Sequence, residues 1–294
     1  MTTDAINRAA ALACFDNPTD IKPLGGGITN VNLQVRDGAR EFVVRIGADI
    51  EEHGVMRWNE LALSQAAAKA GFSPGVVHNE PGILVLEFLQ AATFEEADVR
   101  NPVHLERITD LISRVHRQMG AQLTKPVLAF WPFQVNRTYI TRLGTDGSAH
   151  KALLPALLDH LGQLESAVGR VDLVIAHNDL LAANILDDGE RLWLIDWEYG
   201  GYNSPLFDLA GLASNNGLTE AQERAMLAQY FDTDPDLQWR SYHAMKCASL
   251  MRETLWSMTS EIHSELDFDY AAYTAENMGR LESALSDFAK HQGR

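Results

Sequence analysis

The residues between positions 174 and 209 have types and spacings that suit phosphoryl transfer. Asp179 and Asn184 follow a short β-branched strand, and Asp196 directly follows a second apolar run, Leu192–Ile195. In phosphoryl transfer an Asp accepts the proton of the attacking hydroxyl group, while an Asn and a second Asp hold magnesium against the nucleotide phosphates. We therefore predict three catalytic residues: Asp179 as the base, and Asn184 and Asp196 as ligands of Mg²⁺.

Each of these residues also has an ordinary structural explanation, because Asp179 can cap a turn and Asp196 can end a strand. The order of the residues favours the catalytic explanation. The pattern H-x-D-x-x-x-x-N, from His177 to Asn184, followed by an apolar strand and an Asp, is typical of kinase-like catalytic cores.

A glycine-rich turn precedes a predicted β-hairpin in the first fifty residues. The hairpin strands are expected at 31–35 and 42–46, where apolar and polar residues alternate. Glycine lets backbone N–H groups approach a phosphate closely. The spacing matches neither a Rossmann nor a Walker motif, so a flexible turn is the alternative. The residues of this turn that we expect to bind the nucleotide are Gly25, Gly26, Gly27, Thr29 and Asn30.

A basic residue and an acidic residue follow in an arrangement that suits phosphate binding. Arg45 lies near the end of the second hairpin strand, and Glu60 lies at the start of a helical segment, 59–70. In kinase-like proteins such a pair orients the side chain that contacts the nucleotide phosphates. We predict both residues at the nucleotide. An exposed edge-strand arginine and a surface helix acid remain the alternatives.

The rest of the chain predicts a β-rich first part and a helical second part. A hairpin is expected over 76–89, and Glu87 at its end falls where a hinge would meet adenine, so we include Glu87 among the nucleotide-binding residues. Helical periodicity then dominates, at 104–118, 134–143, 151–168, 219–231, 239–260 and 270–288. We predict an α+β, two-lobed protein-kinase-like fold, with an N-terminal nucleotide-binding lobe at 1–90 and a C-terminal catalytic and substrate-binding lobe at 91–294.

Composition restricts the partners. The net charge is 24 − 40 = −16, which argues against a nucleic acid or an anionic membrane surface and suits a cationic small molecule. Cys14 and Cys247 have no paired spacing and are expected to be reduced. No segment has the length of a membrane span, and the N-terminus lacks the basic-then-apolar order of a signal peptide. We expect a cytoplasmic monomer or homodimer.

These motifs resemble those of the choline/ethanolamine kinases, in particular the bacterial branch, within the wider aminoglycoside-phosphotransferase-like group. The resemblance implies ATP and Mg²⁺ as cofactors and the roles given above for Asp179, Asn184, Asp196, Arg45 and Glu60. The matching segments span most of the chain: Leu24–Asn30 with Asn32, Val44–Ile46, Glu60, His177–Asp179 with Asn184, Ile195–Asn203, Phe207–Asp208, Leu255–Ser257, Phe268 and Tyr273.

The resemblance also implies an alcohol acceptor, with choline as the first choice. Family members that act on choline surround its trimethylammonium group with aromatic rings and acids, and each cation–π contact is worth roughly 0.5–2 kcal/mol. On the residues alone, aromatic side chains on helices are as well explained by the hydrophobic core. The expected substrate-binding residues are Glu198, Tyr199, Tyr202, Trp256, Phe268 and Tyr273.

Two departures leave the acceptor open. Glu253 stands where family members carry a second tryptophan, and Asn215 and Asn216 stand where eukaryotic choline kinases have an acid. Ethanolamine, thiamine and an aminoglycoside therefore remain alternative acceptors. A non-catalytic choline- or nucleotide-binding module is the alternative from another class, although such a protein would be expected to lack one of the three predicted catalytic residues.

Overall fold

The computed structural model describes residues 2–25, 30–264, 266 and 268–290. The chain forms two compact units: unit 1 comprises Met1–Phe94, Gln118–Val127 and Ala183–Tyr199, and unit 2 comprises Glu95–Arg117, Leu128–Ala182 and Gly200–Arg294. The predicted boundary at residue 90 lies near the end of the first segment of unit 1. A single division of the chain does not describe the units, however, because two later segments return to unit 1.

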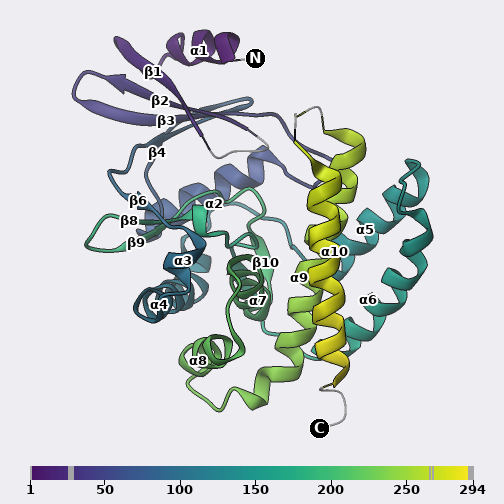
Figure 1. Ribbon diagram of the computed structural model, residues 1–294. Helices are drawn as coiled ribbons and strands as arrows, with labels where there is room; N and C mark the ends of the chain where they lie inside the picture. Colours follow the sequence, from purple (N-terminus) through teal and green to yellow (C-terminus); the bar gives the residue numbers. More distant parts are fainter. Residues whose placement is uncertain (1, 26–29, 265, 267, 291–294) are drawn as a thin grey trace. The chain divides into compact units, whose positions relative to one another are not determined.

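Unit 1 is built on an antiparallel sheet with the strand order β1-β2-β3-β5-β4 (Figure 1). The strands are β1 (Pro18–Leu24), β2 (Val31–Asp37), β3 (Arg40–Ile46), β4 (Val76–Glu80) and β5 (Ile83–Glu87). Both predicted hairpins are present. The sequence did not predict β1, because its residues, PTDIKPL, lack apolar alternation. Prolines are tolerated there because β1 is an edge strand.

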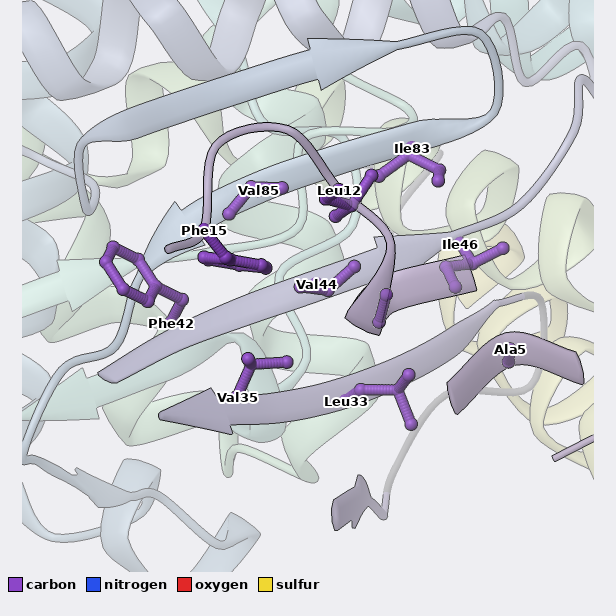
Figure 2. Packing of buried hydrophobic residues seen from close by; sticks show 11 residues of the cluster. Ala5, Leu12, Phe15, Leu33, Val35, Phe42, Val44, Ile46, Ile83 and Val85 are labelled. Carbon is purple, nitrogen blue, oxygen red and sulfur yellow. The ribbon is translucent and has the colours of Figure 1, made fainter. Parts of the chain in front are cut away.

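One face of this sheet carries the hydrophobic core of unit 1. Helix α1 (Thr2–Ala10) and the segment after it pack their apolar side chains onto β2, β3 and β5 (Figure 2). Successive strand residues point to opposite faces. Since Val44 and Ile46 belong to this core, Val43 and Arg45 face the other side of the sheet. The strand pattern thus directs Arg45 away from the core.

The remaining elements of unit 1 include helix α2 (Arg57–Ala70) and a three-stranded sheet. Helix α2 ends at Gly71, whose φ of 80° is left-handed and favours glycine. The small sheet contains β6 (Ala92–Thr93), β8 (Ile185–Asp187) and β9 (Leu192–Leu194). The β8–β9 hairpin carries two of the three predicted catalytic residues at its open end.

Unit 2 is mostly helical. Its central element is α9 (Asp236–His263), which packs against α5, α6, α7 and α10. Helix α7 (Pro205–Asn216) was not predicted, because it is buried on nearly every side and has no polar face to reveal its period. The other elements are α3 (Glu96–Val99), α4 (Pro102–Gln118), α5 (Pro132–Thr145), α6 (Leu154–Val168), α8 (Glu220–Phe231), α10 (Tyr270–Lys290), β7 (Val174–Ala176) and β10 (Gly201–Asn203).

Within the described part of the chain, no helix combines the length and the hydrophobicity that crossing a bilayer requires.

Candidate active site

Unit 1 contains a cavity of about 350 Å³ that joins the large sheet to the β8–β9 hairpin. Its polar lining includes Arg45, Asn184 and Asp196 together with Asn32, Glu87 and Thr93, and apolar side chains also contribute. Such a mixture suits a ligand with a flat apolar ring and a charged tail. The apolar lining includes Leu24, Val43, Leu86, Leu186 and Ile195.

The register of the β8–β9 hairpin places Asn184 and Asp196 together. Ile185 pairs with Leu194, and the N–H of Ile195 donates to the carbonyl of Asn184 at 3.0 Å. Asp196 then leaves the strand with a φ of 69°. This left-handed conformation is one that Asp tolerates better than most residues. The two predicted metal ligands therefore lie at the same end of the hairpin.

These two side chains fit a Mg²⁺ ion. Carboxylate and amide oxygens are hard ligands, and Mg²⁺ is commonly held by one or two protein groups together with substrate phosphates and water. Among the described residues, no cluster of three or more His, Cys, Asp or Glu could hold a metal. The Asp196 side chain is 30% exposed, so it is accessible to a ligand.

Arg45 forms the predicted ion pair with Glu60, at 2.7 Å between Nη1 and Oε1. Its Nη2 atom also lies 2.8 Å from Asp196 and 3.1 Å from Glu198. Burial of Arg45 opposes its charge, but the carboxylates of Asp196, Glu60 and Glu198 raise its pKa above the ordinary value. Arg45 is therefore a permanent cation at the wall of the cavity.

The contacts of Glu198 differ from those expected of an acceptor-binding residue. Its carboxylate is buried in unit 1, where it receives hydrogen bonds from Arg45, from Arg57 at 3.2 Å and from Asn30 at 3.1 Å. Burial and the neighbouring Asp196 raise its pKa. Tyr199 is buried in the same unit. The structure thus joins Glu198 to the phosphate-side cations, and an acceptor role for Glu198 and Tyr199 stays a prediction.

The structure places only some of the other predicted nucleotide-binding residues at the cavity. Gly25 and Glu87 both line the cavity. The Glu87 carboxylate accepts a hydrogen bond from the Gly75 N–H at 3.1 Å, so it also links the end of β5 to the start of β4. Gly26, Gly27 and Thr29 lie outside the described residues. Sequence reasoning missed Arg57, although its position three residues before Glu60 on the same helix is the spacing of an ion pair.

In unit 2, the segment around Asp179 follows β7, which pairs with β10. Residues of β10 also bond to the chain at Leu128 and Phe130, so β10 is held on both sides. Gly201 permits this approach, because a Cβ atom there would lie 2.4 Å from the Leu128 carbonyl oxygen. A close backbone contact thus requires glycine at the start of β10.

A buried carboxylate, that of Asp208, holds the chain just before Asp179. It accepts hydrogen bonds from the backbone N–H groups of His177 at 2.8 Å and Asn178 at 2.7 Å, and it lies 2.9 Å from Nε2 of His116. Asn178 has a φ of 67°, so these bonds stabilise a left-handed turn.

Helix α7 supplies both Asp208 and a second contact to the same loop. Ser204 caps the helix by accepting from the N–H of Leu206, so Asp208 falls in the first turn. At the other end, Asn216 is 1% exposed and its amide donates to the Leu180 carbonyl at 3.2 Å. Asn216 therefore helps to fix the loop that carries Asp179.

Asp179 itself belongs to a charged chain of contacts in unit 2. Nη1 of Arg252 lies 3.6 Å from Oδ1 of Asp179 and 2.7 Å from Oε2 of Glu253. The Tyr273 hydroxyl donates to Oε1 of Glu253 at 2.8 Å. Burial and Glu253 raise the pKa of Tyr273, so the hydroxyl keeps its proton. Arg252 was not predicted, although a charged pair within a buried helix is a recognisable signal.

Three of the predicted substrate-binding rings lie together beside Glu253. The rings of Phe268 and Tyr273 are 5.8 Å apart, and those of Trp256 and Tyr273 are 6.5 Å apart, both nearly perpendicular. Trp256 is 6% exposed and Phe268 is 46% exposed, so the group has a buried side and an open side. Tyr202 is 40% exposed on β10, and its backbone bonds to Leu128 and Phe130.

Comparison with known proteins gives one consistent result. A family model described as choline/ethanolamine kinase matches residues 21–229. A probable ethanolamine kinase of Arabidopsis thaliana is 26% identical and is matched over 88% of this chain and 77% of its own length. A crystal structure of a choline/ethanolamine kinase family protein from Mesorhizobium loti has a TM-score of 0.81 and 26% identity, over 99% of this chain and 97% of that one.

A further similarity concerns the fold alone. The crystal structure of LicA in complex with AMP has a TM-score of 0.73 and 21% identity, over 96% of this chain and 98% of that chain.

Proposed function

The chain belongs to the choline/ethanolamine kinase family, and we propose that it transfers the γ-phosphoryl group of ATP to the hydroxyl of a small cationic amino alcohol. It has the α+β protein-kinase-like fold and a phosphotransferase activity toward an alcohol. The observation that carries the proposal is the cavity of unit 1, which unites Arg45, Asn184 and Asp196 with an apolar wall. The AMP complex of the structural neighbour LicA supports an adenine nucleotide as its ligand.

We assign each residue a role in this reaction. Asp179 orients the acceptor hydroxyl and takes its proton as the oxygen attacks phosphorus. Asn184 and Asp196 would hold Mg²⁺, which would supply positive charge to the phosphate oxygens. Arg45, oriented by Glu60, steadies the phosphates that are not transferred. Positioning and electrostatic stabilisation thus account for most of the catalysis.

Choline is the first acceptor that we propose, and ethanolamine is the second. The rings of Trp256, Phe268 and Tyr273 offer faces and edges to a quaternary ammonium group. Glu253 favours ethanolamine, because a primary ammonium can donate charge-assisted N–H bonds to a carboxylate and a trimethylammonium cannot. Two carboxyl groups, those of Asp179 and Glu253, adjoin one guanidinium, that of Arg252, so the formal charge of the group is 1 − 2 = −1, which suits either cation.

An acceptor screen tests the proposed function. We expect Mg²⁺-dependent ADP release from ATP with choline or ethanolamine, and little with thiamine or an aminoglycoside. The measurement is the initial rate of ADP formation at fixed Mg·ATP, with the product identified by ³¹P NMR. Calorimetric binding of choline without any turnover would contradict the proposal and would favour a binding module.

Replacing Glu253 by Gln should separate the two acceptors. Gln keeps the shape, and its one oxygen can accept from Arg252 while its amide nitrogen donates to the Tyr273 hydroxyl, but it lacks the negative charge. We expect the KM of ethanolamine to rise about tenfold and that of choline by less, since charge-assisted hydrogen bonds are about twice as strong as neutral ones. The measurement is KM and kcat for each alcohol.

Trp256→Ala is the reciprocal variant, since loss of a cation–π contact should raise the KM of choline more than that of ethanolamine. Glu276→Gln, at an exposed acid of α10, is the matched control and should change neither value. Equal changes for both alcohols in Glu253→Gln would show that Glu253 does not select the head group.

A further inference from the structure

Arg57 lies outside the predicted site. Its side chain nevertheless makes four polar contacts within unit 1. Its Nη1 lies 2.7 Å from Oε2 of Glu60 and 3.2 Å from Oε2 of Glu198. Its Nη2 donates to Oδ1 of Asn30 at 2.6 Å, and its Nε donates to the Ala48 carbonyl at 2.8 Å. All three guanidinium nitrogens are therefore engaged, which only the planar fork of arginine permits.

The charges around Arg45 explain why a second cation is needed. Arg45 contacts three carboxylates, those of Glu60, Asp196 and Glu198. A single buried cation that faces three acids leaves a large unpaired negative charge, which is costly where water is excluded. Arg57 pairs with two of the three, Glu60 and Glu198. Asp196, the third carboxylate, pairs with Arg45 and is 30% exposed, so it stays accessible to other ligands.

Asn30 connects this charged cluster to the start of β2. Its amide nitrogen donates to Glu198 at 3.1 Å while its oxygen accepts from Arg57. The pairing of Val31 with Ile46 sets Asn30 beside Gly47. A Cβ atom at Gly47 would lie 2.2 Å from Oδ1 of Asn30 and 3.2 Å from Nη2 of Arg57. The absence of a side chain at position 47 leaves room for this link.

We infer that Arg57 is a positioning residue for the nucleotide phosphates, acting by holding Asn30 at the start of β2 and Glu198 beside Arg45. This inference rests on the proposed ATP-dependent function. A site whose cation is already oriented loses less freedom when its ligand binds. Arg57 itself acts through Asn30 and Glu198, so its effect should be on nucleotide affinity and not on the acceptor.

Arg57→Lys tests the inference without removing the charge. One ammonium group cannot reach Glu60, Glu198 and Asn30 together. We expect the calorimetric Kd of Mg·ATP to rise about tenfold, as is typical when a supporting outer-shell partner is lost. The KM of the acceptor should stay the same. Arg36→Lys is the matched control, because Arg36 forms an exposed ion pair with Glu41 on β2 and β3.

A double-mutant cycle tests the path through Asn30. Gly47→Ala should displace the Asn30 amide by steric contact, with no change of charge, and should also weaken Mg·ATP binding about tenfold. If both variants break the same link, the double variant should bind about tenfold more weakly than the wild type and not about a hundredfold. Thermal unfolding of each variant reports whether the fold is intact.

A wild-type Kd in Arg57→Lys, or effects of the two substitutions that multiply, would overturn the inference. In either case the wild-type protein would still bind Mg·ATP and phosphorylate its acceptor, so the proposed function would stand. If the wild-type protein bound no nucleotide, the proposed function would fall together with the inference.

Discussion

Asp179→Asn is expected to lower kcat about a thousandfold, within the range of about 10²–10⁴ that a positioned general base contributes. An amide cannot accept the proton of the acceptor hydroxyl at neutral pH, although it keeps the size of the carboxylate. The Asp179 side chain is 15% exposed and its nearest described cation, Arg252, is 3.6 Å away. Arg252 keeps its ion pair with Glu253 in this variant, so the substitution leaves no buried cation without a partner. Folding should therefore be little affected.

The measurement combines steady-state rates with single-turnover experiments and calorimetry of Mg·ATP. We expect the Kd of the nucleotide to change by less than about twofold, since the predicted role of Asp179 belongs to the transition state. Asp172→Asn, at an exposed acid before β7 in the same unit, is the control and should be silent. Undiminished turnover in Asp179→Asn would remove Asp179 from the mechanism.

Asp208→Asn should reduce stability and activity together, in contrast to Asp179→Asn. Asp208 is 2% exposed and accepts two backbone N–H bonds in addition to its contact with His116. An amide nitrogen in place of one oxygen would face a donor and leave a buried group unpaired. Breaking a buried charged pair from one side costs about 3–5 kcal/mol. The segment that leads to Asp179 would then lose its fixed turn.

Denaturant unfolding measures the loss of stability, and amide hydrogen exchange at residues 177–182 measures the loosening of the turn. The pH dependence has a defined sign. Burial acts to raise the pKa of Asp208, but the hydrogen bond and charge of His116, together with the other donors, hold it below the ordinary value of 3.8. A depressed carboxyl pKa contributes stability above the unfolded value of about 3.9 that is lost as pH falls through the folded value.

We therefore expect the difference in unfolding free energy between wild type and Asp208→Asn to be full at neutral pH and to shrink below about pH 4. Asp110→Asn is the control, because Asp110 forms an exposed pair with Arg114 on the helix that carries His116. A fully stable Asp208→Asn variant, or a difference that grows with acid, would contradict this account.

Much of the fold was predictable from local pattern. Alternation predicted the first hairpin of unit 1, a turn followed by an apolar run predicted the second, and helical spacing predicted α2, α4, α5, α6, α8, α9 and α10. Strand β1 and helix α7 are among the elements that the sequence did not predict, and they were missed for opposite reasons. Strand β1 has too few apolar residues to show an alternation, and helix α7 has too few polar ones to show a helical period.

The candidate site was predictable in its residue types and less so in its partners. Asp179, Asn184 and Asp196 follow strands at short, definite spacings, so they could be proposed from the sequence alone. Glu198 lies two residues after Asp196 and was assigned to the acceptor because of its neighbours in the chain. The structure instead surrounds its carboxylate with Arg45, Arg57 and Asn30.

The difference between the features that were predictable and those that were not follows from the range of the interactions. A strand end or a helix start is determined within a few residues, and the sequence expresses it directly through alternation, spacing and capping. The partners of a buried charge are not local: Glu198 meets Arg57 across 141 positions and Asn30 across 168. His116 meets Asp208 across 92. Such contacts form only when the intervening chain has folded and excluded water, since an exposed charge needs no partner. For this reason the chemistry could be proposed from the linear order of residues, whereas the supporting roles of Arg57, Asp208 and Arg252 depended on the tertiary structure.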